Sequence, residues 1–177
     1  MTQRPQSVPS FAELLSSAER SAVHLELRDS YAVAEESEER QLWESGMWTL
    51  TDGRRALADW MTLVRSVTER GVAVRRARVV SEPVTSYVRY EHALSPLNIE
   101  AGELVRWLPR RQALGIALPA ADFWLIDGRL VRFNHFSGDG EAIEPEMSED
   151  PAVVALCSSA FEAVWDRAVP HEKYTVA

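Results

Sequence analysis

Hydrophobic and polar residues follow two different periods along this chain, and their succession predicts a layered α/β structure. Alternation with a period of two, or runs of β-branched residues, predicts strands over residues 21–28, 72–80 and 103–109. Apolar residues at helical spacing predict long helices over residues 54–70 and 150–168. Gly71 follows the first of these helices directly and gives it a natural end. Helices that alternate with strands in this way are typical of a sheet covered by helices.

Shorter segments add further helices. Ser10 and Glu13 form a capping box, which predicts the start of a short helix. Residues 51–53 (Thr-Asp-Gly) predict a break before the helix at 54–70. A further helix is expected over residues 84–94, with Pro96 closing it. In the strand at 21–28, the alternation predicts one buried face.

The segment 122–136 reads as a β-hairpin. Asp127-Gly128 is a tight-turn dipeptide between two apolar strands, and such a turn joins antiparallel neighbours. The predicted fold class is therefore α/β or α+β, with a mixed β-sheet flanked by helices. We expect residues 1–8 to be a disordered lead and residues 9–177 to form a single globular domain.

Composition narrows the classes of function. With 177 residues, 46% of them hydrophobic, the chain can bury a real core, and it has no apolar run long enough to span a membrane. A formal net charge of −8 argues against DNA binding by this chain alone. The lone cysteine, Cys157, excludes an internal disulfide and a cysteine-based zinc site. The chain lacks a signal peptide and any metal or cofactor motif, so we expect a cytoplasmic protein without a cofactor.

Arginine and aromatic residues supply the candidate binding site. Arg76 and Arg78 lie on one face of their predicted strand, where two guanidinium groups can clamp a carboxylate or a phosphate. The alternative is a sheet face whose arginines are paired with acids of the chain itself. The candidate ligand- or partner-binding residues are Arg76, Arg78, Tyr87, Arg89, Arg106, Trp124 and Asp127.

Candidate catalytic residues are few. The chain lacks a glycine-rich phosphate loop, a serine nucleophile elbow and a zinc-protease motif. If the protein is an enzyme, Asp122, Asp127 and His135 are the acid–base candidates. The alternative is structural: Asp127 accepts backbone hydrogen bonds at the turn, and Trp124 belongs to the core. Without a standard nucleophile, a non-enzymatic protein is favoured.

Five segments together resemble an uncharacterised actinobacterial family. They are residues 25–31, 78–83, 87–89, 101–103 and 122–127. Members of that family are often encoded beside, or fused to, WhiJ-type helix-turn-helix regulators of development and secondary metabolism. The resemblance implies a regulatory module that binds a protein partner, namely a helix-turn-helix transcription regulator.

A second, more distant resemblance is to half of a phospholipase D-like domain. Those enzymes carry the spacing His-x-Lys-x-x-x-x-Asp, and alignment on Asp127 puts Ala120 at the histidine and Asp122 at the lysine position. Asn134 stands where those enzymes have a small glycine. The resemblance therefore implies a degenerate active site, and it implies a homodimer, because such half-domains often pair about a twofold axis.

Three hypotheses of function follow from the sequence. The first is a non-enzymatic regulatory module that binds a helix-turn-helix regulator, whose basic surface the negative charge would complement. The second is a sensor of a small anionic metabolite with a cleft near the arginines. The third is an enzyme of phosphodiester or natural-product chemistry that uses Asp127 and His135.

Overall fold

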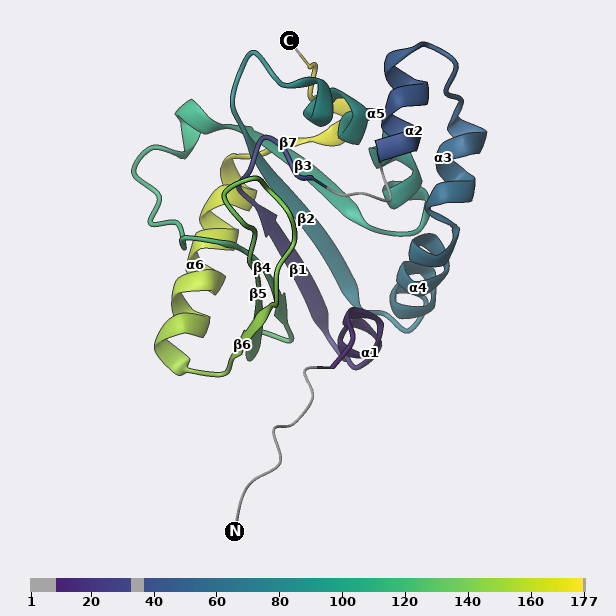
Figure 1. Cartoon of the computed structure of the whole chain (residues 1–177). Helices are drawn as coiled ribbons and strands as arrows, with labels where there is room; N and C mark the ends of the chain where they lie inside the picture. The colour runs from purple at the N-terminus through teal and green to yellow at the C-terminus, as the bar shows by residue number, and fades with distance from the viewer. Residues whose placement is uncertain (1–8, 33–36, 177) are drawn as a thin grey trace.

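The computed structural model describes residues 9–32 and 37–176, which form one sheet between two layers of helices (Figure 1). The seven strands lie in the order β6-β5-β4-β1-β2-β3-β7. They are β1 (Ser21–Glu26), β2 (Ala73–Val80), β3 (Leu104–Pro109), β4 (Asp122–Ile126), β5 (Leu130–Asn134), β6 (Glu146–Ser148) and β7 (Val169–Pro170). β1, β2 and β3 run parallel, whereas the remaining pairs are antiparallel. The prediction of a single domain with a mixed sheet is confirmed.

Five helices cover one face of the sheet and α6 covers the other (Figure 1). The helices are α1 (Phe11–Ser16), α2 (Ser37–Glu44), α3 (Leu50–Ala56), α4 (Ala58–Thr68), α5 (Ser86–Glu100) and α6 (Pro151–Arg167), with short 3-10 turns η2 (Arg110–Ala113) and η3 (His171–Lys173). Among the described residues, no helix combines the length and apolarity needed to cross a bilayer. The predicted disordered lead, residues 1–8, lies outside the described residues.

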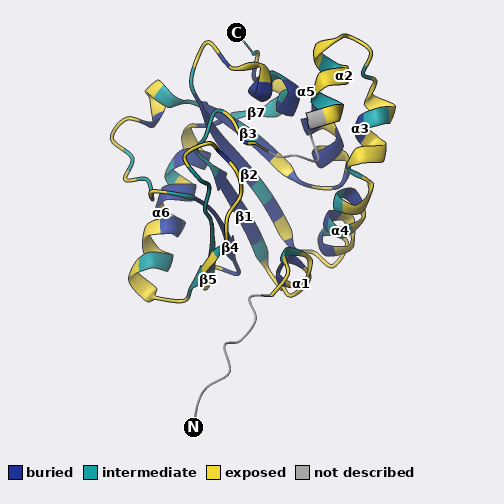
Figure 2. Cartoon of the chain, viewed as in Figure 1, coloured by how far each residue is buried: buried dark blue, intermediate teal, exposed yellow. Residues whose placement is uncertain are grey.

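The central strands are buried on both faces, so the prediction of a single buried face for the first strand is wrong. In β1, Val23 and Leu25 pack with the residues of α6, including Phe161. On the opposite face, Ala22 packs with residues of α1, α4 and α5. Figure 2 shows that most of β1 and β2 is buried, whereas the outer surfaces of the helices are mainly exposed. Parallel strands with helices on both sides are expected to be buried in this way.

The helices before β2 begin earlier than predicted. Thr49 caps α3 by a reciprocal capping box with Asp52, so residues 51–53 lie inside a helix and not in a break. The interruption falls instead at Leu57, between α3 and α4. The position of Gly53 within α3 requires a residue without a side chain, because a β-carbon there would lie 2.5 Å from a ring atom of Trp48.

Pro96 does not close the helix that contains it. α5 continues to Glu100, although proline removes one backbone donor from the helix interior. Leu94 and Leu97 on either side are almost fully buried in the core under α4. Burial of this helix face outweighs the local cost of the proline. The rule that a proline ends a helix considers only the local sequence and leaves out the free energy of this burial.

The predicted hairpin is confirmed. β4 and β5 pair in the register Asp122↔Asn134 to Ile126↔Leu130. Three residues, 127–129, lie between the strands, and the first two of them have positive φ angles, 53° at Asp127 and 67° at Gly128, as a type I′ turn requires. This turn fixes the register, and the register decides which side chains of β4 and β5 share a face.

We predict that Gly53→Ala lowers the free energy of unfolding by about 1–2 kcal/mol. The clash with the indole of Trp48 and with Leu94 outweighs the gain of up to ~1 kcal/mol in helix propensity. Urea denaturation measures the difference. Gly138→Ala is the matched control, because a β-carbon at Gly138 meets no atom within 4 Å. Equal stability of the two variants would contradict this packing role.

Candidate functional site

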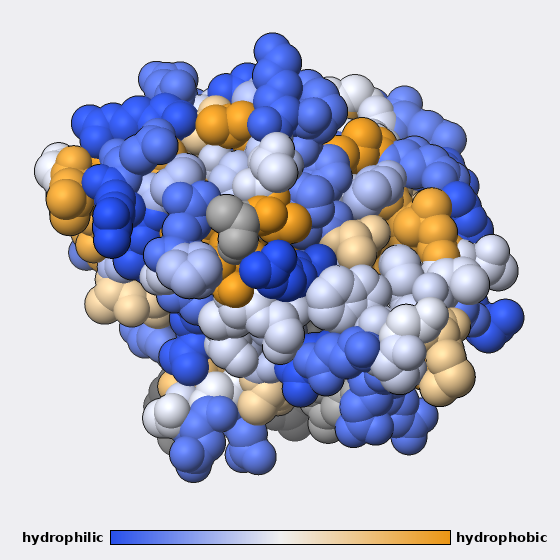
Figure 3. All heavy atoms as spheres, turned by 90° about the horizontal axis from the view of Figure 1, so that it is seen from above, coloured by the Kyte–Doolittle hydropathy of each residue, from blue (hydrophilic) through white to orange (hydrophobic). Residues whose placement is uncertain are grey.

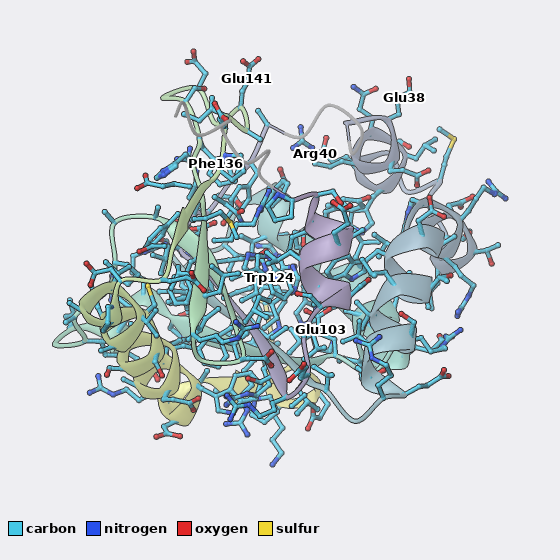
Figure 4. The ribbon with its side chains drawn as sticks, turned by 90° about the horizontal axis from the view of Figure 1, so that it is seen from below. Glu38, Arg40, Glu103, Trp124, Phe136 and Glu141 are labelled. Atoms are coloured by element: carbon cyan, nitrogen blue, oxygen red, sulfur yellow. The ribbon has the colours of Figure 1, made fainter. Side chains whose placement is uncertain are left out.

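A pocket of about 350 Å³ lies between the sheet and the helices α1, α4 and α5. It is lined by aromatic, arginine and acidic side chains from seven segments of the chain. They are Phe11, His24, Leu57, Trp60, Arg76, Arg78, Glu91, Leu94, Asn98, Trp124 and Arg132. Figure 4 shows Trp124 in the interior beside α1, away from Glu38 and Glu141 at the periphery.

The floor of the pocket is one row of residues across four neighbouring strands. His24 of β1 pairs with Arg76 of β2 on one side and with Trp124 of β4 on the other. Trp124 pairs in turn with Arg132 of β5. Directly paired residues point to the same face of a sheet, so register alone brings these four side chains together.

Two of the arginines at this site are neutralised by the chain itself. Arg76 donates to Glu103 at 2.6 Å and to Glu26 at 3.0 Å. Arg78 lies 2.9 Å from the second oxygen of Glu26 and 2.5 Å from a carboxylate oxygen of Glu91. Burial opposes the charge of Arg76, but the adjacent carboxylates outweigh it and raise the pKa of that guanidinium. Arg76 and Arg78 are therefore committed to a buried ion network.

Arg132 differs from these two arginines because it forms no ion pair with any described residue. One terminal nitrogen donates to the side-chain oxygen of Asn134, and its Nε is buried without a hydrogen-bond partner in the described part of the chain. Its guanidinium lies 5.4 Å from the ring centre of Phe11. Burial lowers the pKa of Arg132, as expected for a cation without a counterion.

His24 is the second polar group of the pocket that lacks partners. The residue is 7% exposed, and neither ring nitrogen has a hydrogen-bond partner in residues 9–32 or 37–176. Its Nδ1 lies 3.6 Å from Glu26, which is too long for a hydrogen bond. Burial, followed by the charges of Arg76, Arg78 and Arg132, lowers the pKa of His24 far below its usual value. The neutral ring stacks on Trp124 with 4.3 Å between centres.

The aromatic wall contributes a third unused donor. Phe11, Trp60 and Trp124 contact one another, with ring centres 4.9 to 6.0 Å apart. The indole Nε1 of Trp60 is buried and has no partner among the described residues. Buried polar atoms are nearly always paired with protein, water or a ligand. The pocket thus presents unused hydrogen-bonding groups from three residues: Trp60, His24 and Arg132.

Asp122 lies on the same face of the sheet, in a hydrogen-bonded pair with Tyr31. The Tyr31 hydroxyl and the backbone N–H of Leu27, the latter at 2.8 Å, donate to the two carboxylate oxygens. Burial raises the pKa of Asp122 to about 6, against the opposing effect of these hydrogen bonds, and the nearby charge of Glu26 adds to the increase. Burial also raises the pKa of Tyr31.

The other two catalytic candidates lie apart from Asp122. Asp127 stands at the far end of β4, about 16 Å away for an extended strand of this length. It accepts hydrogen bonds from the backbone N–H groups of residues 19–21. His135 lies 3.3 Å from Glu146 near the surface. The arrangement does not bring the three candidates together, and it supports the structural alternative for Asp127.

The remaining binding candidates divide between two faces of the sheet. Arg106 lies on the α6 side, where it donates to the carbonyl of Trp165 and covers that indole at 4.4 Å. Tyr87 is buried, with its ring centre 5.5 Å from that of Tyr31. Arg89 is half-buried and does not line the pocket. Of the seven predicted binding residues, Arg76, Arg78 and Trp124 line it.

The candidate binding residues predicted from the sequence did not include Arg132, His24 and Trp60, which the structure brings into one site. A signal for Arg132 was present, because it alternates with Val131 and Phe133 in a strand next to Trp124. The strand order, which brings β1 between β2 and β4, was not available from that pattern. Among the described residues, no group of three or more histidine, cysteine or acidic side chains could hold a metal ion.

Comparisons with known proteins agree with this fold. The model of a family described as "Domain of unknown function (DUF6879)" matches residues 9–176. A phospholipase D family member, Nuc from Salmonella typhimurium, is similar in structure, with a TM-score of 0.52 and 12% identity over 90% of this chain and 86% of that chain. At that identity the likeness shows the fold alone.

A weaker structural likeness is to TrmBL2, described as an archaeal chromatin protein with a novel mode of DNA binding. Its TM-score is 0.43 at 13% identity, over 89% of this chain and 48% of that chain, and it carries no argument about function. A sequence search of curated proteins finds no match to this chain.

We predict that the free energy of unfolding of Asp122→Asn increases relative to that of wild type as the pH rises. The folded-state pKa of about 6 exceeds the ordinary value of 3.8, so folded wild type binds the extra proton between these values and loses stability as pH rises through them. The asparagine cannot ionise, so the difference in unfolding free energy between variant and wild type should shift in its favour by about 2 kcal/mol between pH 4 and pH 7.5.

Urea denaturation at several pH values measures this difference, and Asp127→Asn is the control with the opposite sign. Burial would raise the pKa of Asp127, but backbone donors outweigh burial and lower it. Its contribution is present above the unfolded pKa and is lost as pH falls. A pH-independent difference for Asp122→Asn would contradict the assigned environment.

Proposed function

We propose that this chain, which belongs to the DUF6879 family of domains of unknown function, is a non-enzymatic module that binds a small anionic ligand. The observation that carries the proposal is Arg132, a partly buried cation without a counterion among the described residues, which lines the pocket of about 350 Å³. Pockets of this size, mostly apolar with a few converging polar groups, are typical of small-molecule sites.

The charges around the pocket explain why Arg132 would receive the anion. Arg76 and Arg78 are already shared among Glu26, Glu91 and Glu103. An anion at either of them would have to displace a buried carboxylate, which leaves that carboxylate unpaired at a cost of several kcal/mol. An anion at Arg132 displaces no ion-pair partner in the described chain and supplies the counterion that the guanidinium lacks.

Two observations favour binding over catalysis. The acid–base candidates Asp122, Asp127 and His135 lie at separate places, and Asp122 is held by Tyr31. In the alignment with the phospholipase D motif, Ala120 and Asp122 stand at the nucleophile and phosphate-clamp positions. Neither side chain supplies the chemistry of the residue that it would replace.

A second proposal, a regulatory module for a helix-turn-helix transcription regulator, rests on a different surface. Met47 and Leu50 are 69% and 43% exposed, and Leu42 of α2 is 38% exposed nearby in the sequence. Viewed from above, the molecule shows separate apolar patches in a mainly hydrophilic surface (Figure 3). With a net charge of −8, such a surface suits a basic partner in actinobacterial development or secondary metabolism. A homodimer stays a prediction.

For the first proposal, we predict that Arg132→Gln abolishes ligand binding and leaves the protein folded. A thermal-shift screen of the metabolite pool from the host should give at least one anionic compound that stabilises the wild type. Because Arg132 lacks an ion-pair partner in the described structure, the variant should be at least as stable as wild type without ligand.

The matched control is Arg129→Gln, which removes an exposed arginine from the same hairpin outside the pocket. The control should retain the thermal shift of the wild type. If every compound that stabilises the wild type also stabilises Arg132→Gln equally, Arg132 is not the anion site. If no anionic compound stabilises the wild type, the ligand-binding proposal fails.

For the second proposal, we predict that Met47→Ser/Leu50→Ser prevents co-purification with a helix-turn-helix regulator of the proposed class that is co-expressed with this chain. Both side chains are exposed, so the loss of apolar contact area should weaken the complex and change the fold little. Leu114→Ser is the control, since Leu114 is 78% exposed elsewhere on the surface. Failure of the wild-type pair to co-purify after co-expression would contradict the proposal.

A further inference from the structure

The pocket offers one cation, Arg132, that no carboxylate of the described residues contacts. Glu26, Glu91 and Glu103 face the charges of Arg76 and Arg78, and His24 is neutral because burial opposes its protonation. The remaining cation is Arg132. Three carboxylates face two arginines in the ion network, so the network carries one negative charge and Arg132 brings the total to zero. A monoanion in contact with Arg132 adds one negative charge to this balance, whereas a dianion adds two next to the three buried carboxylates, so the site favours the monoanion.

The walls of the pocket match a flat apolar body. Phe11, Trp60 and Trp124 form a contiguous aromatic surface, with Phe11 and Trp60 stacked at 5.7 Å between ring centres. Leu57 and Leu94 line the same pocket. A cavity of about 150 Å³ is known to hold benzene, so about 350 Å³ provides room for roughly two fused rings.

The unused polar atoms point to an acceptor group on that body. The Nε of Arg132 and the Nε1 of Trp60 are donors without partners in the described structure, and the neutral ring of His24 can donate from one nitrogen. A carboxylate provides acceptor oxygens for such donors and carries a single negative charge, which would contact Arg132. Arginine pairs with a carboxylate in a planar fork geometry.

We propose that the ligand is an aromatic monocarboxylate with one or two fused rings, held at its carboxylate by Arg132 and at its rings by Trp60 and Trp124. This inference rests on the proposed ligand-binding function and narrows it to one chemical class. It assigns the anion to an arginine of β5, with Arg76 and Arg78 keeping their intramolecular partners.

A matched set of probes tests the class by isothermal titration calorimetry. The set is 2-naphthoate, its neutral amide, the saturated decahydronaphthalene-2-carboxylate and 2-naphthyl phosphate. We expect 2-naphthoate to bind about tenfold or more tightly than each of the others, because only it combines planarity with a single charge. Arg132→Gln should remove the preference for the carboxylate over the amide, and Arg129→Gln should retain it.

A second variant tests the role of a neutral hydrogen-bond donor, so the test does not depend only on the charge of Arg132. Trp60→Phe retains an aromatic ring and removes the Nε1 donor, so binding of 2-naphthoate should weaken by about three- to tenfold. An unchanged affinity would overturn the assigned role of Trp60. Circular dichroism confirms that each variant is folded before titration.

The outcomes separate the ligand class from the broader function. Equal or tighter binding of the saturated acid or of the phosphate overturns the aromatic monocarboxylate and leaves anion binding at Arg132 intact. If none of the probes binds, yet a host anion stabilises wild type and not Arg132→Gln, the class is wrong and the function stands. If neither probes nor host anions bind, the proposed function fails, and the inference falls with it.

Discussion

The carboxylate of Glu26 is the group on which the character of this site depends. It lies at the end of β1, and its two oxygens approach Arg76 at 3.0 Å and Arg78 at 2.9 Å. Glu103, which directly precedes β3, and Glu91 of α5 complete the pairing. Buried charges are costly unless they are paired, and removal of one partner from such a network commonly costs about 3–5 kcal/mol. The network therefore ties strands and helix together while it neutralises the two arginines.

Because Arg76 and Arg78 are neutralised, the far end of the row that begins at Arg76 can have a different role. His24 and Trp124 continue the row from Arg76 towards β5, and Arg132 ends it without an ion-pair partner in the described chain. One face of the same sheet thus carries arginines in ion pairs on β2 and an arginine without an ion pair in the described chain on β5. A structural ion network and a candidate anion site can lie side by side because β4 and β5 bring an arginine but no carboxylate to this row.

Much of this arrangement can be predicted from the sequence, because local patterns determine it. The period of two in β1 puts His24 and Glu26 on one face, and the Asp127-Gly128 turn fixes the register of the hairpin. The break at residues 51–53 and the end at Pro96 were wrong, since a capping box and burial of α5 override local propensities. The pairing of Arg76 and Arg78 depends on contacts between distant segments, so the sequence left open whether they were paired or available.

The most direct test of the account is a crystal structure of the protein purified from its native host. We expect a planar molecule in the pocket, with a carboxylate within about 3.2 Å of the Arg132 guanidinium and with Arg76 still bound to Glu26 and Glu103. A carboxylate of the chain itself paired with Arg132, and side chains filling the pocket, would contradict it.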